Sequence, residues 1–346
     1  MAYARIAARH FGANHHEYYV TPADIVSSVP KLAASYDQPF GNSSVVPAYH
    51  CALMARHAGI DKILAGDGGD ELFGGNTRYA KQRIFEVYSK VPHAVRTAIL
   101  ERVFAEPSVF GRVRPFSKVA SYIAQARTPL PDRMQMYNLL ARLGHDQLFH
   151  PEFLASVDVD DPARQQRRTF ENVNAVSLVN RMLGFDWKYT LADNDLPKVV
   201  GATALAGLPA GFPLLDAQLV EFSLRLAPSL KLKRLSLRWF FKEALRGYLP
   251  DQILAKQKHG FGLPFGPWLI RGGALLDLAS SSLQRLADRG IVRPDFVQRL
   301  LRDLLPSAPG YYGELVWILM MLEQWWSNNE LRKSESPLRH PHNPVT

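Results

Sequence analysis

The stretch KILAGDGGDELFGGNTRYA, residues 62–80, constrains the fold of this chain more than any other part of its sequence. The short apolar run from Asp61 to Ala65 predicts a buried strand, and two glycine clusters and three carboxylates follow it directly. Glycine lets backbone approach a ligand where a Cβ would obstruct it, and fixed carboxylates bind cations or move protons. Because open α/β sheets bind ligands at the carboxyl ends of their strands, this stretch predicts a ligand site at a sheet edge.

The rest of the sequence predicts an α/β fold with a helical continuation. Residues 15–20 alternate as a strand, and Thr21 and Pro22 predict the start of a helix that ends near Tyr36. From about Tyr79 the apolar residues recur three and four apart, which indicates helices. These patterns divide the chain into an α/β part at 1–78, a helical part at 79–330 and a polar tail at 331–346 that we expect to be disordered.

Composition excludes several classes of function. The net charge is +9, but the basic residues are scattered, so we expect no nucleic-acid partner and favour a phosphate-rich small molecule. Cys51 is the only cysteine, which rules out a disulfide framework or a thiolate zinc site within one chain. No apolar run reaches the roughly 18 residues that span a bilayer, and no secretory signal is present, so we expect a cytoplasmic protein without a membrane partner.

The glycine stretch also carries a family resemblance. GDGGDELFGG, residues 66–75, resembles the signature of the glutamine-hydrolysing asparagine synthetases, in their C-terminal synthetase domain. Four more segments match this family in the same order: QPFGNSSVVPAY, LADNDLPK, FPLLDAQLVEFSLRL and LRGYLPDQILAKQKHGFGLPFGPWL. The resemblance implies the adenine-nucleotide alpha-hydrolase-like (ATP pyrophosphatase) type of parallel sheet, here incomplete at its N-terminus.

The resemblance implies an ATP-dependent amide ligase. Such an enzyme uses ATP and Mg²⁺ to adenylate the side-chain carboxylate of aspartate, and ammonia then attacks the acyl adenylate. The family pattern places Asp67 where the adenylate forms, and Ala65 with Gly66 where ATP binds. Backbone N–H groups at Gly66, Gly68 and Gly69 suit phosphate oxygens. Asp67 and Asp70 could bind the substrate ammonium, orient magnesium or take a proton from ammonia, and the residues alone do not choose between these roles.

Other candidate residues lie outside the glycine stretch. Lys258 matches the lysine that the family places over the phosphates, where its charge stabilises the transition state and the leaving pyrophosphate. Lys198 is a second candidate for binding the nucleotide. Ser43 and Ser44 either bind nucleotide or cap the following helix, and the sequence supports both interpretations equally.

Three departures from the family bear on activity. No cysteine precedes Cys51, so we expect no glutaminase domain and no glutamine hydrolysis by a terminal cysteine. The pyrophosphate loop of the form S-G-G-x-D-S is also absent, which suggests a shortened gene, an alternative start or a split gene with a separate chain that supplies both parts. Gly201, Pro209 and Gly211 stand where relatives commonly carry an arginine and a Glu-x-Arg pair, which removes charges near the site.

Two further interpretations stay open beside aspartate amidation by this chain. A relative with the same fold acts on another carboxylate, as a β-lactam synthetase or an amidotransferase associated with cell-surface polysaccharide does. The chain could instead be a non-catalytic binding or assembly subunit that retains the fold alone. Substitutions such as Gly201 suit either a fragment under relaxed selection or a changed substrate.

Overall fold

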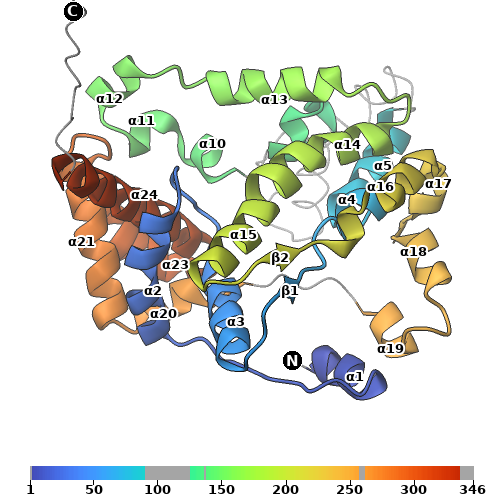
Figure 1. The fold of residues 1–346 in the computed structure, drawn as a ribbon. Helices are drawn as coiled ribbons and strands as arrows, with labels where there is room; N and C mark the ends of the chain where they lie inside the picture. The colour runs from blue at the N-terminus through green and yellow to red at the C-terminus, as the bar shows by residue number, and fades with distance from the viewer. Residues whose placement is uncertain (1, 90–124, 136–137, 257–261, 336–346) are drawn as a thin grey trace, which may run out of the picture.

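The computed structural model describes residues 2–89, 125–135, 138–256 and 262–335, in which helices predominate (Figure 1). The strands of these residues form two small two-stranded sheets. The expected α/β class therefore holds in a mainly helical form, and the larger sheet of the ATP pyrophosphatase type remains a prediction. Elements remote from the site are α10 (Leu139–Leu143), α11 (His145–Leu148), α12 (Pro151–Ser156), α19 (Asp251–Leu254), α22 (Pro294–Arg299), η2 (Asp132–Gln135), η5 (Leu300–Leu304) and α23 (Leu305–Ser307).

The sheet that leads to the glycine stretch joins distant parts of the chain. β1 (Ile63–Leu64) runs parallel to β2 (Ala210–Gly211), and the Ala65 N–H donates to the Gly211 carbonyl at 2.8 Å. The strand expected between Asp61 and Ala65 is thus confirmed over its centre, but it is not buried as expected, since Leu64 is 67% exposed. Its partner comes from the helical part of the chain, however, so the sheet is not built within residues 1–78 as expected.

The strand expected at residues 15–20 is wrong. This segment is extended and has no ladder partner among the described residues; its side chains bind neighbouring helices instead. The Glu17 carboxylate accepts hydrogen bonds from Arg5 of α1 (Ala2–His10) at 2.5 and 2.6 Å. The Tyr18 hydroxyl donates to Asp24 of α2 (Pro22–Ser35) at 2.9 Å. The alternation of apolar and polar residues therefore predicted a strand where the chain has an extended connection between two helices.

The helix expected from Pro22 is confirmed. Thr21 and Asp24 form a reciprocal capping box at the start of α2, which fixes that helix end. Together with α20 (Phe265–Ile270) and α21 (Ala274–Asp288), α2 packs around α24 (Pro309–Glu335) in the larger core, to which α3 (Val45–His57) contributes through its contacts with α2 and α15 (Leu196–Leu205). Figure 1 shows α2, α20, α21 and α24 gathered together.

The long helix α24 forms the centre of this core. Trp317 on α24 is fully buried and its ring packs edge-on against Phe265 at 5.2 Å between centroids. The helix continues to Glu335, so residues 331–335 of the predicted disordered tail are helical. Residues 336–346 lie outside the described part of the chain. None of the helices in the described ranges is long and apolar enough to cross a membrane.

A smaller core lies beneath the glycine stretch. Its buried residues come from α5 (Thr77–Ser89), α13 (Asp161–Asn172), α14 (Leu178–Asp186) and β3 (Leu232–Lys233), which pairs with β4 (Ser236–Leu237). These residues are Tyr79, Phe170, Met182, Leu183, Phe185 and Leu232. Figure 1 shows β1 and β2 between this group of helices and the larger core. The glycine stretch therefore lies where the two groups meet.

Candidate active site

The local packing explains the two glycine clusters. Gly68, at the start of α4 (Gly69–Phe73), has φ +93°, and a Cβ there would lie 2.3 Å from Leu215 Cδ2. Gly74 ends α4 at φ +75°, in the left-handed region that favours glycine. At Gly75 a Cβ would lie 1.8 Å from Asp70 Oδ1. Gly66 differs from these because nothing lies within 4 Å of its Cβ position, which leaves its backbone open to a ligand.

A cavity of about 330 Å³ opens at this loop. It lies at the carboxyl end of β1, where the sequence predicted a ligand site. Its lining residues are Gly66, Asp67, Gly68, Gly69, Asp70, Glu71, Thr190, Asp195, Leu214, Arg238 and Phe241. The sequence-predicted residues Asp67 and Asp70 are thus brought together with groups from three other segments of the chain. We call this space the glycine-loop cavity.

Lys198 connects two carboxylates of the glycine-loop cavity. Its Nζ lies 2.8 Å from Asp195 and 3.5 Å from Asp67. Burial raises the pKa of Asp67, and the Lys198 ammonium opposes that effect. A carboxylate with a raised pKa is a better proton acceptor, so Asp67 suits general-base chemistry better than a fully exposed aspartate would.

Asp70 is held by an arginine in an unusual conformation. Arg238 Nη1 lies 3.2 Å from Asp70 Oδ1. Arg238 has φ +53° and immediately precedes α18 (Trp239–Ala244). Its backbone N–H donates to the Gly74 carbonyl at 3.2 Å. Its Nε is buried and has no hydrogen-bond partner in the described residues. A residue in this region of backbone space is energetically costly, and such residues concentrate at functional sites.

A π-helical segment supplies the opposite wall. Thr190 and Asp195 lie five residues apart on η3 (Trp187–Asp195), and both line the glycine-loop cavity. Five residues make about one hydrogen-bonded turn of a π-helix, so this geometry places both side chains on one face. The Thr190 hydroxyl donates to Asp186 at 3.1 Å and accepts from Arg78 at 3.2 Å. Thr190 is therefore fixed from behind by a buried carboxylate.

Glu71 is the most deeply buried acid of the cavity, with 4% of its surface exposed. Burial, with smaller effects from the nearby carboxylates Asp70, Asp195 and Asp186, raises the pKa of Glu71 to about 7. No cation pairs with its carboxylate within the described ranges. The Trp187 indole N–H donates to the Glu71 backbone carbonyl at 3.2 Å, which holds α4 against η3.

The remaining predicted residues lie around or beyond the cavity. The backbone N–H of Ala65 donates a hydrogen bond to the Gly211 carbonyl of β2. Ser43 is buried and Ser44 is the N-cap residue of α3, but neither lines the glycine-loop cavity, and the Ser44 side chain makes no capping hydrogen bond. Their role with nucleotide stays a prediction. Lys258 lies outside the described residues, so its proposed role also stays a prediction.

Sequence reasoning missed four polar residues of the cavity. They are Glu71, Thr190, Asp195 and Arg238. Glu71 stands inside the glycine stretch and Asp195 inside LADNDLPK, so both were within matched segments and could have been found. Arg238 has no comparable signal, because only the fold brings a residue so far along the chain to Asp70.

Gly201 packs against Tyr36, whose hydroxyl contacts the backbone next to Lys198. Gly201 lies on α15 (Leu196–Leu205), and a Cβ there would lie 2.3 Å from the Tyr36 hydroxyl oxygen. The Tyr36 hydroxyl donates to the Pro197 carbonyl at 3.0 Å, one residue from Lys198. Tyr36 thus occupies the space beside Gly201, and a larger side chain there would displace it.

Comparison with known proteins gives the family. The family model for asparagine synthase matches residues 1–327, so the chain belongs to the asparagine synthase family. It is 22% identical to asparagine synthetase [glutamine-hydrolyzing] 1 of Bacillus subtilis over 346 residues, which are 99% of this chain and 52% of that protein.

Two further relatives carry related names. A putative asparagine synthetase [glutamine-hydrolyzing] of Mycobacterium bovis is 25% identical over 92% of this chain and 47% of its own length. A putative asparagine synthetase [glutamine-hydrolyzing] 2 of Methanocaldococcus jannaschii is 35% identical over 94 residues, 27% of this chain and 18% of its own length. The chain therefore spans about half the length of the first two relatives. No solved structure matches it.

Proposed function

We propose that the glycine-loop cavity binds ATP with Mg²⁺ and ligates ammonia to the side-chain carboxylate of aspartate. The observation that carries this proposal is the gathering of Asp67, Asp70 and Asp195 with Lys198 and Arg238 around an open glycine backbone. A transfer reaction between charged groups needs such positioned charges of both signs. Family membership supports the same chemistry.

The donor set of the cavity fits Mg²⁺. Mg²⁺ is usually bound by one or two carboxylates together with substrate phosphates, so a complete protein cage is not needed. In the described residues no three His, Cys, Asp or Glu side chains converge as a metal site. Asp67, Asp70 and Asp195 would repel a triphosphate by themselves, and a bound Mg²⁺ would bridge these charges and polarise the phosphate.

The chain's own groups then have distinct roles. The backbone at Gly66 and Gly68 approaches the phosphates, and the unpartnered Nε of Arg238 donates to a phosphate oxygen. Lys258 stabilises the leaving pyrophosphate, as the family resemblance implies. Asp67 assists formation of the acyl adenylate, as the family resemblance implies, and its raised pKa also suits it to accept a proton from ammonia in the later step.

A second polypeptide is part of the proposal. Relatives named as glutamine-hydrolyzing are about twice as long as the matched region, which leaves room in them for further domains. Leu64 of β1 is 67% exposed, although parallel strands are usually covered on both faces. We infer that a separate chain packs against β1 and supplies a pyrophosphate loop and a glutaminase domain, and that the assembly works in the cytoplasm.

Reconstitution tests this function. The chain is co-expressed with the part of the Bacillus subtilis relative that it does not match, and aspartate-dependent exchange of labelled pyrophosphate into ATP is measured. We expect exchange with aspartate, a reduction of about a hundredfold for Asp67→Asn, and little change in ATP binding. Asp193→Asn is the matched control, because Asp193 pairs with the exposed Lys188 and does not line the cavity.

The negative outcomes discriminate the alternatives. A folded complex without any exchange contradicts catalysis and favours a non-catalytic subunit. Exchange that depends on another carboxylic acid instead of aspartate favours a β-lactam synthetase-like enzyme or a different amidotransferase. Release of glutamate from glutamine by the isolated chain would contradict ammonia as the nitrogen source of this chain.

A further inference from the structure

A second and larger cavity lies behind the glycine stretch. Its volume is about 510 Å³, within the range of small-molecule sites. It is formed by α4, α14, the loop at 173–177, α16 (Ala217–Arg225) and α17 (Pro228–Lys231), which Figure 1 shows on one side of the molecule. We call it the α14–α17 cavity. It shares Glu71 with the glycine-loop cavity and otherwise has different walls.

Two buried polar groups that line this cavity lack partners in the described residues, and a third lining group is a buried acid. Lys231 lines it and is only 3% exposed, yet its ammonium has no hydrogen bond or ion pair among the described residues. Asn180 also lines it, and its Oδ1 is buried without a hydrogen-bond partner there. Glu71 is 4% exposed, and its carboxyl forms no ion pair among the described residues. A buried charge or amide oxygen without a partner is unfavourable, so Lys231 and Asn180 call for a partner that the described residues do not provide.

The remaining walls are mostly apolar. Val173, Leu183, Trp187 and Leu224 line the cavity, and 63% of Leu224 is exposed. A bound molecule would therefore meet hydrocarbon over most of its surface and polar groups of opposite character at a few points. Lys231 requires an anion or another acceptor, whereas Asn180 Oδ1 requires a donor.

We propose that the α14–α17 cavity binds a free α-amino acid with an apolar side chain, with its carboxylate on Lys231 and its ammonium on Asn180 Oδ1 and Glu71. Such a zwitterion carries in one small molecule both the anion that Lys231 requires and the donor that Asn180 Oδ1 requires. Its side chain would cover the apolar wall at Leu183 and Leu224. The site is separate from the one proposed for ATP and aspartate, and its occupancy would act on that site through the shared Glu71.

Titration calorimetry on the full chain, without ATP, tests this site directly. L-leucine, L-valine and L-phenylalanine are the probes. Isovalerate, which is valine without its ammonium, and isoamylamine, which is leucine without its carboxylate, are the analogues. We expect at least one of the amino acids to bind, and each analogue that lacks one charged group to bind about tenfold more weakly or worse. Because the readout is binding alone, failure of ATP-dependent chemistry would not affect it.

Variants of the two lysines near the end of α17 complete the test. Lys231→Met should reduce affinity for the best amino acid by about tenfold or more. This variant should fold at least as well as the parent, because it removes an unpaired buried ammonium. Lys233→Met is the matched control, since Lys233 is exposed and does not line the cavity. Absence of binding by all three amino acids overturns the proposal, as does unchanged affinity in Lys231→Met or equal binding of the analogues.

Discussion

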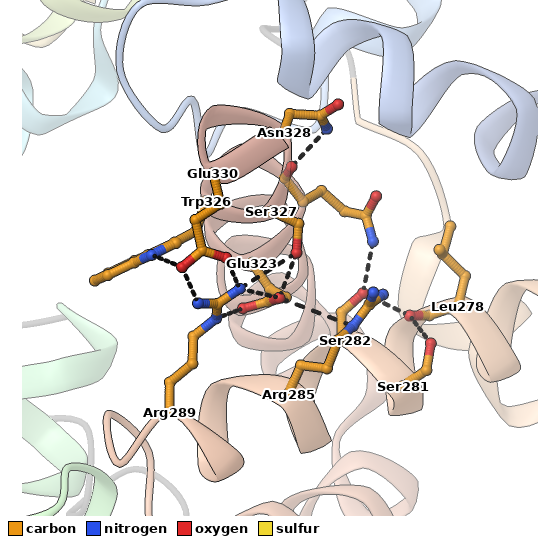
Figure 2. Close-up of polar contacts among 11 residues, drawn as sticks. Leu278, Ser281, Ser282, Arg285, Arg289, Glu323, Trp326, Ser327, Asn328 and Glu330 are labelled. Atoms are coloured by element: carbon orange, nitrogen blue, oxygen red, sulfur yellow. Dashed lines mark hydrogen bonds and ion pairs between the residues drawn. The ribbon is translucent and has the colours of Figure 1, made fainter. Parts of the chain in front are cut away.

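Two charged clusters of this molecule use their carboxylates in different ways. Between α21 and α24, Glu323 is fully buried and accepts hydrogen bonds from Arg289 at 2.8 Å and from Ser327 at 2.7 Å (Figure 2). In the glycine-loop cavity, Asp67 pairs with Lys198 at 3.5 Å and Asp70 with Arg238 at 3.2 Å, and both aspartates line open space. The carboxylate of the first cluster is enclosed between two helices, whereas those of the second line a cavity that can receive a ligand.

The difference extends to the backbone around each cluster. Glu323 and Arg289 belong to the long regular helix α24 and the end of α21. Asp70 pairs with Arg238, whose φ is positive, and it packs against Gly75, where a side chain would overlap the Asp70 carboxylate. Regular helices maximise stability, but a site needs groups whose interactions are completed only when substrate binds. We therefore expect substitutions in the two clusters to separate stability from function.

The largest effect is expected at the saturated cluster. Glu323→Ala leaves Arg289 and Arg285 without their shared buried carboxylate, and Arg289 is itself mostly covered. Removal of one partner of a buried ion pair typically lowers the free energy of unfolding by about 3–5 kcal/mol. Chemical denaturation followed by circular dichroism measures this change.

Glu330→Ala provides the comparison on the same helix. Glu330 binds the same Arg289 at 2.6 Å, but its side chain is 53% exposed. Exposed ion pairs contribute about 0–1 kcal/mol, so this variant should lose little stability. Equal losses in Glu330→Ala and Glu323→Ala would mean that burial does not distinguish these carboxylates and would contradict the assignment of Glu323 as the centre of the cluster.

The second prediction concerns the pH dependence contributed by Glu71. Its pKa rises from 4.5 to about 7 on folding, so the folded state holds a proton that the unfolded state has lost between these values. Stability therefore falls as pH rises from about 4.5 to 7. The shift corresponds to about 3 kcal/mol as an upper bound. Glu71→Gln should match the parent near pH 4 and exceed its stability above pH 7.

Thermal and chemical unfolding across pH 4–8 measure this difference. Asp193→Asn serves as the control, because Asp193 is exposed and pairs only with Lys188 in the described contacts. A constant difference between Glu71→Gln and the parent over the whole range would show that the Glu71 carboxyl does not titrate in the folded state as proposed.

The glycine stretch shows how much of the site the sequence could predict. Residue types and spacing placed a ligand site after a strand, and the structure has a cavity there lined by Asp67 and Asp70. Lys198 was also predicted and contacts the cavity's carboxylates. Arg238 could not be predicted, because its contact with Asp70 depends on a turn whose positive φ no local pattern indicates.

The fold was predictable where local signals were strong. Thr21 and Pro22 predicted the start of a helix, and the periodicity after Tyr79 predicted further helices; the structure confirms α2 and helices such as α14. The strand expected at 15–20 failed because alternation cannot show whether a neighbouring strand exists. The sheet around β1 was incompletely predicted for a related reason, since its partner β2 lies far along the chain and is only two residues long.

The smallest predicted change in the free energy of unfolding distinguishes two glycines of the same stretch. At Gly75 a Cβ would overlap the Asp70 carboxylate, at 1.8 Å from Oδ1, so Gly75→Ala must displace either Asp70 or the end of α4. Overpacking of this kind typically costs about 1–3 kcal/mol of stability. Gly66→Ala meets nothing within 4 Å, and its change in stability should stay within about 0.5 kcal/mol. Urea denaturation of both variants provides the measurement. Equal stability of the two variants would contradict a packing requirement at Gly75 and leave ligand approach as the common reason for both glycines.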